Sequence, residues 1–361
     1  MYKYKVNVYA ISKNEEKFVD RWVNSMKEAD NIYVLDTGSK DNTVSLLKKR
    51  GVIVKVKEII PWRFDVARNI SLEMVDKECD ICVCTDLDEL FKKGWRENLE
   101  KVWENNLNRL KYNYNWSLDK YNKPIVNFYT DKIHSRNGYK WINPVHEILQ
   151  YKDQNEIFKT TDKITLNHYP DKTKSRKGYL KLLELSVLED PNNDRNMHYL
   201  GREYMYYGYY NKAIATLIRH LNLKNATWDC ERCASMRFIA RCYKNLKKSK
   251  EAKMWLELAI KEAPFLRDPY VEMAFLECDL ENYKETEKNL KKALQIKKHD
   301  KIYMNEVFSW DHTIYDLLSI SLFYQEKYQE SFEYISKALK MNKESKRLQE
   351  NFKIIKKFVE D

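Results

Sequence analysis

The feature of this sequence that most restricts its fold is a regular alternation of strand-like and helix-like segments over the first ~90 residues. The strand-like runs are short and apolar, and they cover residues 4–11, 31–35, 52–56 and 80–85. Between them, apolar residues recur at helical spacing over residues 15–28, 41–50 and 67–75. Strand–helix–strand alternation at this spacing predicts a mostly parallel sheet with helices on both of its faces.

Residues 107–168 have a different pattern. Short runs such as 113–116, 125–128, 140–142 and 163–166 read as strands, and polar turns separate them. We expect these strands to form an antiparallel extension that completes the first domain.

From about residue 175 helical periodicity takes over, and glycine becomes rare. Self-similar helical pairs cover residues 196–223, 235–264, 268–297 and 314–341. Ala259 and Ala293 hold equivalent places in two of these pairs and are 34 residues apart, which is the tetratricopeptide period. The next equivalent residue, Ala338, comes 45 residues later, so we expect an insertion or irregular loop near residues 300–311.

These patterns predict two domains. Residues 1–172 are expected to form an α/β domain with a Rossmann-like sheet, and residues 173–361 an all-α solenoid of tetratricopeptide type. Apolar residues make up 43% of the chain, which is enough to bury a core in each domain.

Composition excludes several classes of protein. The chain has no apolar run of about 18 residues, and its N-terminus lacks the apolar segment of a secretory signal. Its seven cysteines have no framework spacing, which favours reduced thiols and a cytoplasmic location. The net charge of +11 is spread along helices without a nucleic-acid-binding motif. We therefore expect no nucleic-acid partner, whereas a modest positive field suits an anionic ligand.

Polar motifs follow the predicted strands, where ligands bind on parallel sheets. Asp86 and Asp88 come directly after the fourth strand, and two carboxylates there can hold Mg²⁺ or Mn²⁺ against a nucleotide diphosphate. Alternatively, residues 86–89 cap the next helix, whose apolar stripe includes Leu90 and Trp95.

The segment after the second strand, residues 36–43, reads DTGSKDNT. Asp36 at the strand end can accept a hydrogen bond from a base or ribose, and Gly38 permits close approach of the backbone to a ligand. Asp41 and Thr43 are equally explained as caps of the following helix. Arg68, after the third strand, has a planar fork suited to pyrophosphate or uracil oxygens, and it is otherwise a surface residue at a helix start.

Together, the strings KNEE, VLDTGSKDNT, FDVARN and DLDE resemble the family 2 glycosyltransferases with a GT-A fold. The resemblance is to the subgroup with C-terminal tetratricopeptide repeats, to which the sublancin-type peptide S-glycosyltransferases belong. It implies a hexosyltransferase-type enzyme that moves a sugar from a uridine diphosphate donor to a protein, peptide or glycan acceptor, with inversion. The nucleotide-sugar-binding places of the family match Ile11, Lys13, Glu15, Asp36, Gly38, Arg68 and Asp86, and its Asp-x-Asp matches Asp86 and Asp88.

Inverting transfer needs a general base near the acceptor. Glu147 is our first candidate and His146 its neighbour, by analogy with a similar Val-His-Glu string in related proteins. A structural His-Glu pair at a strand edge is the alternative. His168 can complete the shell of Mn²⁺ or Mg²⁺ opposite Asp88, or can be a structural histidine.

The repeat domain has two interpretations. The tyrosines at 199, 204, 206, 207, 209 and 210 either pack within the repeats or form a surface that binds a protein or peptide acceptor. Repeats of this kind also mediate homodimers. A non-catalytic scaffold with a degenerate transferase domain remains the alternative for the whole chain, although the intact Asp86/Asp88 pair favours an enzyme.

Overall fold

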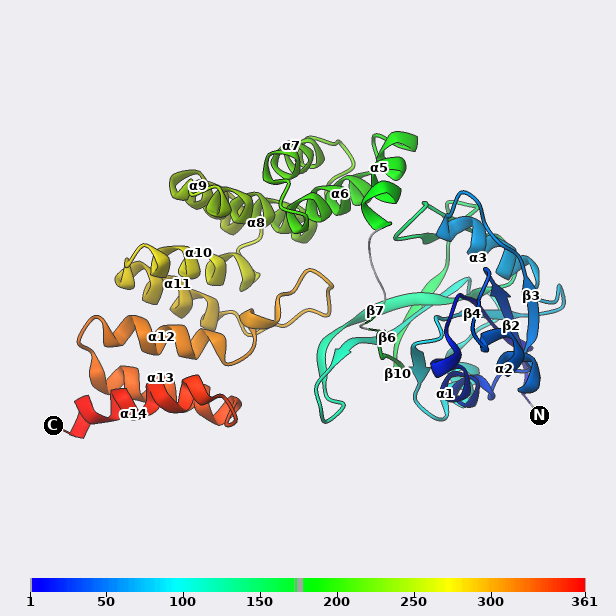
Figure 1. Cartoon of the computed structure of the whole chain (residues 1–361), viewed down its shortest axis with the longest axis horizontal. Helices are drawn as coiled ribbons and strands as arrows, with labels where there is room; N and C mark the ends of the chain where they lie inside the picture. The colour runs from blue at the N-terminus through cyan, green and yellow to red at the C-terminus, as the bar shows by residue number, and fades with distance from the viewer. Residues whose placement is uncertain (1, 172, 174–177, 361) are drawn as a thin grey trace. The chain divides into compact units, whose positions relative to one another are not determined.

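A computed structural model of the chain describes residues 2–171, 173 and 178–360. Its internal contacts divide the chain into two compact units, Met1–Ser186 with Lys301–Tyr303, and Val187–Asp300 with Met304–Asp361 (Figure 1). The predicted class is confirmed, because a mostly parallel sheet with helices is followed by a helical solenoid. The boundary expected after residue 172 falls at a position outside the described residues, and the division into compact units lies further along, after Ser186.

The first unit alternates strands and helices before it becomes strand-rich. Its elements are β1 (Val6–Ser12), α1 (Glu16–Met26), β2 (Asn31–Asp36), α2 (Thr43–Lys49), β3 (Ile53–Val56), α3 (Phe64–Glu73), β4 (Ile81–Cys84), β5 (Glu89–Phe91), α4 (Trp95–Val102), β6 (Arg109–Leu118), β7 (Pro124–Ser135), β8 (Tyr139–Ile142), β9 (Ile148–Tyr151), β10 (Phe158–His168) and most of α5 (Tyr179–Glu189). Each of the strands and helices expected in the first 90 residues is present.

Eight of these strands form one sheet in the order β3-β2-β1-β4-β7-β6-β10-β5. The strands β1 to β4 are mutually parallel, whereas β7 is antiparallel to both β4 and β6. Strand β10 then runs parallel to β6, and β5 closes the edge antiparallel to β10. The expected antiparallel extension is therefore partly correct. Strands β8 and β9 form a separate two-stranded sheet.

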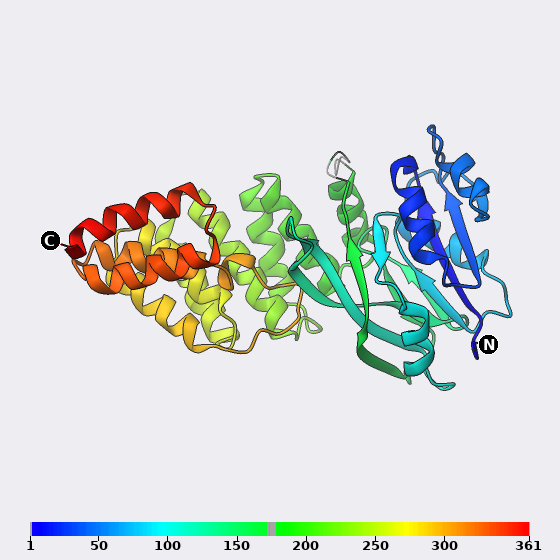
Figure 2. The same ribbon diagram turned by 90° about the horizontal axis from the view of Figure 1, so that it is seen from below.

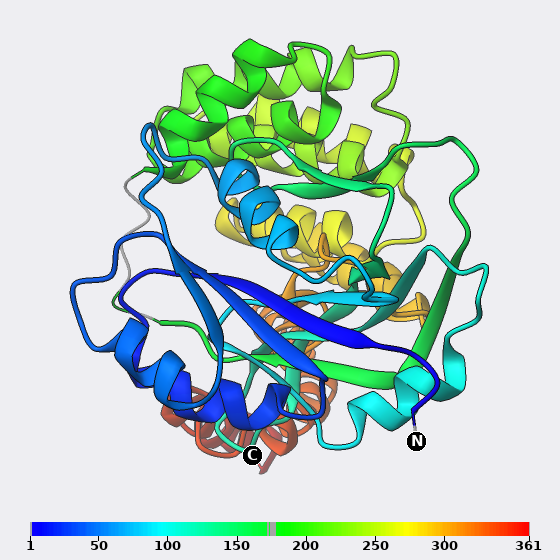
Figure 3. The same cartoon turned by 90° about the vertical axis from the view of Figure 1, so that its right-hand side faces the viewer.

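Strand β1 is the centre of the first unit because both of its faces are buried. Val6, Val8 and Ala10 point into a core with α1, α2 and α4, while Tyr9 between them points into a second core under α3. Figure 3 shows α1 and α2 on one face of the strands and α3 on the other. The alternation of apolar side chains on both faces explains why this run reads as a continuous buried strand.

The second unit contains four helical pairs and a final helix (Figure 2). Its elements are α6 (Asp194–Tyr206), α7 (Tyr210–Leu221), α8 (Asp229–Asn245), α9 (Ser249–Glu262), α10 (Asp268–Asp279), α11 (Tyr283–Gln295), the short 3₁₀ helix η1 (Val307–Ser309), α12 (Thr313–Phe323), α13 (Tyr328–Met341) and α14 (Lys346–Glu360). All four predicted pairs are confirmed, and the irregular segment expected near residues 300–311 contains only η1. None of the helices in the described ranges has the length and hydropathy needed to cross a bilayer.

The repeats share a turn geometry that the sequence does not reveal. In each pair, the residue two positions before the second helix adopts a left-handed conformation: Gly208, Lys247, Glu281 and Glu326, with φ of 77°, 62°, 60° and 60°. Only the first of these is glycine, the residue that adopts this conformation without strain. The alanines used to find the period, Ala259, Ala293 and Ala338, are fully buried, as close helix approach requires.

Gly201 in α6 lies where this helix packs closely against α7. A Cβ atom at this position would lie 2.5 Å from Cγ and 2.6 Å from Cδ2 of Leu217, a fully buried side chain of α7. The absence of a side chain at residue 201 therefore sets the distance between these two helices.

We predict that Gly201→Ala destabilises the repeat unit by about 1–2 kcal/mol, because overpacking outweighs the gain in helix propensity. Thermal melting followed by the helix signal in circular dichroism measures this effect. Leu217→Ala in the same chain should offset part of the Gly201→Ala loss, because it removes the clashing atoms. Simple addition of the two single losses would contradict steric conflict as the cause.

Candidate functional site

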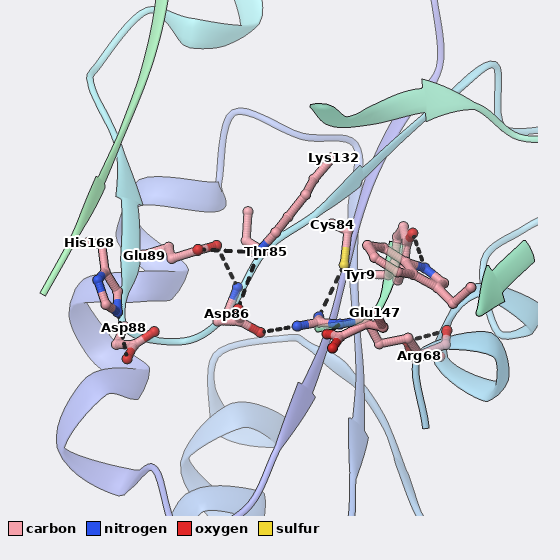
Figure 4. A network of polar contacts seen from close by, with 12 residues as sticks. Tyr9, Arg68, Cys84, Thr85, Asp86, Asp88, Glu89, Lys132, Glu147 and His168 are labelled. Carbon is pink, nitrogen blue, oxygen red and sulfur yellow. Dashed lines mark hydrogen bonds and ion pairs between the residues drawn. The ribbon is translucent and has the colours of Figure 1, made fainter. Parts of the chain in front are cut away.

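The predicted motifs converge at one edge of the sheet, at the carboxyl ends of parallel strands. Ser12 at the end of β1 pairs in register with Asp36 at the end of β2, and Asp86 follows β4, the other neighbour of β1. Figure 4 shows the side chains around Asp86 as a row, with Asp88 and His168 at one end and Arg68 and Glu147 at the other.

Asp36 is fully buried, and its own loop uses both of its carboxylate oxygens. Oδ1 accepts hydrogen bonds from the backbone N–H groups of Gly38 and Ser39 at 3.0 and 2.8 Å. Oδ2 accepts from the hydroxyls of Ser12 and Ser39 at 2.8 and 2.5 Å. Gly38 has φ of 103°, which suits glycine alone. In this arrangement Asp36 holds the loop in shape, and a direct bond from Asp36 to a nucleotide remains a prediction.

The loop after β1 is bonded to the loop after β2. Glu15 is buried, and its backbone N–H donates to Thr43 Oγ1 at 2.7 Å. Ile11 packs beside Leu35 in a small apolar cluster, while Lys13 is exposed. The structure thus brings Ile11, Lys13 and Glu15 next to the Asp36 loop, as the resemblance implies, and a nucleotide contact for them remains a prediction.

Arg68 connects three parts of the site. Its guanidinium, only 4% exposed, donates from Nη2 to Asp86 Oδ1 at 2.7 Å and from Nε to Glu147 Oε1 at 2.5 Å. Nη1 lies 3.3 Å from the Cys84 sulfur, and the group sits over the Trp141 ring. The alternative that Arg68 is a surface residue is therefore wrong. Burial alone would lower its pKa, but Asp86, Cys84 and Glu147 raise it well above the usual value.

Lys132, on β7, is a site residue that the sequence analysis missed. Its Nζ lies 3.2 Å from Asp86 Oδ2 and 3.2 Å from Glu89 Oε1. Glu89 is buried and also accepts from the Tyr114 hydroxyl at 2.6 Å. Lys132 is one of many lysines and lies 46 residues from Asp86, so only the pairing of β7 with β4 brings the two residues together.

Charges in this cluster shift one another's proton affinities. Burial favours the neutral acid, but Arg68 and Lys132 hold the pKa of the Asp86 carboxyl well below its usual range. Burial disfavours the ammonium of Lys132, yet Asp86 and Glu89 raise its pKa well above the usual value. Burial raises the pKa of Glu89, and it raises the pKa of the Cys84 thiol to about 11. The network therefore keeps Asp86 as an anion between two cations.

Asp88 and His168 form a second pair. His168 Nε2 lies 3.4 Å from Asp88 Oδ2, and His168 Nδ1 lies 3.0 Å from the carbonyl oxygen of Trp116. Because a carbonyl oxygen only accepts hydrogen bonds, Nδ1 carries a proton and Nε2 faces the carboxylate. Burial lowers the pKa of His168, but Asp88 outweighs it and raises the pKa above 6.5. The predicted proximity of His168 to Asp88 is present.

A group of at least three His, Cys, Asp or Glu side chains arranged to hold a metal is absent from the described residues. Asp86 is occupied by Arg68 and Lys132, so the sequence-based assignment of Asp86 as a metal ligand has no support in this geometry. Asp88 and His168 supply two atoms of suitable chemistry. Mg²⁺ and Mn²⁺ commonly take only one or two protein ligands and complete their shell with phosphate oxygens and water. The two residues fit that kind of site.

Glu147 and His146 lie in the turn between β8 and β9. Asn143 and His146 in this turn adopt left-handed conformations with φ of 78° and 50°, which for residues other than glycine are strained. Glu147 is directed at Arg68, whereas the His146 ring lies 6.1 Å from the Tyr179 ring. Glu147 therefore belongs to the cluster around Asp86.

The alternative interpretation of residues 86–89 as a helix cap is wrong. These residues lead into strand β5, and the next helix, α4, begins only at Trp95.

Comparison with known proteins places a match over the first part of the chain. Residues 8–166 match the model of the family described as Glycosyl transferase family 2. An uncharacterized glycosyltransferase of Rickettsia bellii is 32% identical over 100 residues, which are 27% of this chain and 33% of that protein. A similar protein of Rickettsia conorii is 31% identical over 100 residues, or 27% and 34% of the two chains. The match therefore spans about a third of the length of these relatives.

Among solved structures, the chain is similar to the crystal structure of MamA, with 18% identity and a TM-score of 0.38 over 46% of this chain and 88% of that one. A chain of the APC/C hetero-tetramer Cut9–Hcn1 is 11% identical, with a TM-score of 0.41 over 50% of this chain and 32% of that one.

Proposed function

We propose, from the premise that residues 8–166 form a family 2 glycosyltransferase domain, that this protein transfers a sugar from a uridine diphosphate donor to an acceptor. The reaction inverts the anomeric carbon and depends on Mn²⁺ or Mg²⁺. The observation that carries the proposal is the pair formed by Asp88 and His168 beside the buried cluster around Asp86.

Two atoms that can each bind a cation face each other in that pair. When the imidazole is neutral and Nδ1 of His168 donates to the Trp116 carbonyl, the Nε2 lone pair and the Asp88 carboxylate repel unless a proton or a metal ion lies between them. Adjacent ligands of an octahedral Mg²⁺ at ~2.1 Å lie about 3 Å apart, close to the 3.4 Å that separates Nε2 from Oδ2. A histidine that binds a metal commonly donates its other N–H to a backbone carbonyl, as this one does.

The charge balance of the cluster also favours a cation. Four carboxylates face two permanently charged basic groups and one imidazole there: Asp86, Asp88, Glu89 and Glu147 against Arg68, Lys132 and His168. A nucleoside diphosphate brings further negative charge, which a site with excess carboxylates would repel. Asp88 and His168 would hold a divalent ion, which would offset that repulsion and supply Lewis-acid chemistry to the leaving diphosphate.

In this proposal Asp86 positions Arg68 and Lys132 and does not bind the metal. Each of its two oxygens bonds to one of these cations, so their remaining N–H groups are held at the sheet edge where the diphosphate binds. Fixed donors at that place stabilise charge as it develops on the departing phosphate, without reorganisation during the reaction.

Glu147 is the proposed general base, and the geometry indicates which of its two carboxylate oxygens takes the proton. Its Oε1 accepts from Arg68 at 2.5 Å, so the proton of the acceptor would go to its other oxygen. Arg68 then fixes the orientation of the carboxylate relative to the diphosphate site.

The repeat unit is proposed to bind the acceptor, as a protein or peptide. Residues 195–250 contain twelve Lys and Arg against three Asp and Glu, so this part of the array carries most of the net positive charge. Tyr206, Tyr207 and Tyr209 are exposed there, and Lys212 lies over the rings of Tyr204 and Tyr209. Exposed tyrosines beside cations suit an acidic polypeptide segment.

Metal dependence is tested by thermal unfolding with UDP-glucose, UDP-galactose and UDP-N-acetylglucosamine, with Mn²⁺ or with EDTA. At a ligand concentration of 100 times Kd we expect stabilisation of about 2.7 kcal/mol, a shift of several degrees that requires Mn²⁺. Asp88→Asn should abolish the shift, while Glu97→Gln, at an exposed carboxylate of α4, should keep it. No metal-dependent shift of the wild-type protein with any donor would favour a non-catalytic scaffold.

For the base, we predict that Glu147→Gln lowers kcat by roughly 10²–10⁴ and leaves the KM for the donor unchanged. The amide oxygen can still accept from Arg68, so the fold and the donor site should persist. Steady-state kinetics with His146→Gln as the comparison decide the assignment. An unaltered kcat in the Glu147 variant would exclude Glu147 as the base.

For the acceptor surface, we predict that Tyr206→Ala combined with Lys212→Glu weakens binding of a fluorescent glutamate-rich peptide by roughly tenfold. Loss of an aromatic contact and reversal of a charge both contribute. Fluorescence anisotropy at two salt concentrations measures it. Lys357→Glu, an exposed charge reversal on α14, is the control. If the double variant and the Lys357→Glu control bind the peptide equally well, the result counts against an acidic acceptor at this surface. Binding of the peptide to the wild-type protein that does not depend on salt also counts against it.

A further inference from the structure

We infer that Trp116 is a specificity-determining residue whose open indole face is a platform for a pyranose ring at the metal end of the site. The inference rests on the proposed function, since it requires a nucleotide sugar to bind beside Asp88 and His168. It goes further by naming the residue that contacts the sugar.

Trp116 differs sharply in exposure from its neighbours on β6. Its side chain is 47% exposed, whereas Tyr114 and Asn115 immediately before it are 5% and 3% exposed. One face of the indole is stacked on the His168 ring, with centroids 4.5 Å apart and planes 26° apart. Tyr114 approaches edge-on at 6.0 Å. The exposed area of Trp116 therefore belongs to the side of the ring that His168 leaves open.

Trp116 lies in β6, at an irregularity in the pairing of this strand with β7 and directly after a paired residue. Asn115 pairs with Asn127 on β7 and with Asn167 on β10, so the backbone next to Trp116 is held from both sides. The Trp116 carbonyl oxygen accepts from His168 Nδ1 at 3.0 Å. A large aromatic side chain that is already ordered binds a ligand with little loss of conformational entropy.

The chemistry of Asp88 and His168 indicates which part of the ligand the Trp116 ring contacts. In the proposed function Asp88 and His168 would hold the cation next to the diphosphate, and the donor pyranose is attached directly to that diphosphate. A sugar ring has one face rich in C–H groups, and such a face packs on the broad π surface of an indole. Its hydroxyls then point to the side, where polar groups can select among sugars. A glycan acceptor has the same chemistry and is the second source of such a ring.

Trp116 also stacks on His168, so the experiment must separate a platform from a residue that only orients the histidine. Trp116→Leu removes the π surface and keeps an apolar side chain, while Trp116→Phe keeps a smaller aromatic ring. Tyr121→Leu, at an exposed position in the β6–β7 turn, is the matched control. The carbonyl bond to His168 is a backbone contact and persists in each variant.

The measurement is calorimetric binding to the full chain with Mn²⁺, comparing UDP with whichever of UDP-glucose, UDP-galactose and UDP-N-acetylglucosamine binds best. We expect Trp116→Leu to weaken the nucleotide sugar by roughly five- to tenfold and to leave UDP within about twofold. Trp116→Phe should lie between wild type and Trp116→Leu, and Tyr121→Leu should match wild type. The affinity for Mn²⁺ in the presence of UDP should not change.

Other results have defined meanings. If UDP and Mn²⁺ weaken as much as the nucleotide sugar, Trp116 only orients His168 and the inference fails. If the Trp116→Leu variant binds the nucleotide sugar as tightly as wild type, Trp116 is not a platform for the donor sugar. In that case, loss of methyl β-glucoside binding to the UDP–Mn²⁺ complex of the variant would assign the platform to an acceptor ring. Retained binding of both ligands overturns the inference. If the wild-type protein binds none of the three nucleotide sugars, the proposed function itself fails.

Discussion

The buried guanidinium of Arg68 is the interaction on which the site depends. It joins α3 to the residue after β4 and to the turn between β8 and β9, by bonds to Asp86 and Glu147. A charge with this little exposure is stable only while its N–H groups keep their acceptors and at least one carboxylate balances it, because an unpaired buried ion costs several kcal/mol. The positions of the two candidate catalytic segments are therefore linked through one side chain.

The cluster around Asp86 and the pair formed by Asp88 and His168 have different electrostatic properties. In the cluster, Arg68 and Lys132 already balance the Asp86 carboxylate, and both of its oxygens are engaged by these two side chains. In the pair, an imidazole nitrogen faces the Asp88 carboxylate, and no Lys or Arg among the described residues forms an ion pair with Asp88. Asp86 and Asp88 of one short motif thus have different partners, because different strands and side chains surround them.

The sequence predicted what depends on local pattern. The alternation of strands and helices, the repeat period and the place of Asp86 and Asp88 at a strand end are all present. The proximity of His168 to Asp88 is also present, although it was expected from the metal-binding chemistry of these residues and not from a local pattern. Long-range pairing accounts for what it missed. Lys132 reaches Asp86 because β7 pairs with β4, and Trp116 meets His168 because β6 pairs with β10. The sequence also does not reveal that Asp36 accepts hydrogen bonds from Ser12 on the neighbouring strand and from the backbone of its own loop, and its contact with a nucleotide stays a prediction.

The turns of the repeat unit have a consequence for its evolution and engineering. Three of the four left-handed turn positions hold Lys247, Glu281 and Glu326, where a residue with a Cβ atom carries a conformational cost of about 1 kcal/mol each. Glycine at these places would relieve that cost without altering any packed side chain, at some expense from the greater entropy of the unfolded chain. Stabilising glycine substitutions are thus available at these three turns. Such substitutions can compensate for destabilising changes elsewhere on the repeat surface, for example changes selected for binding to a new partner.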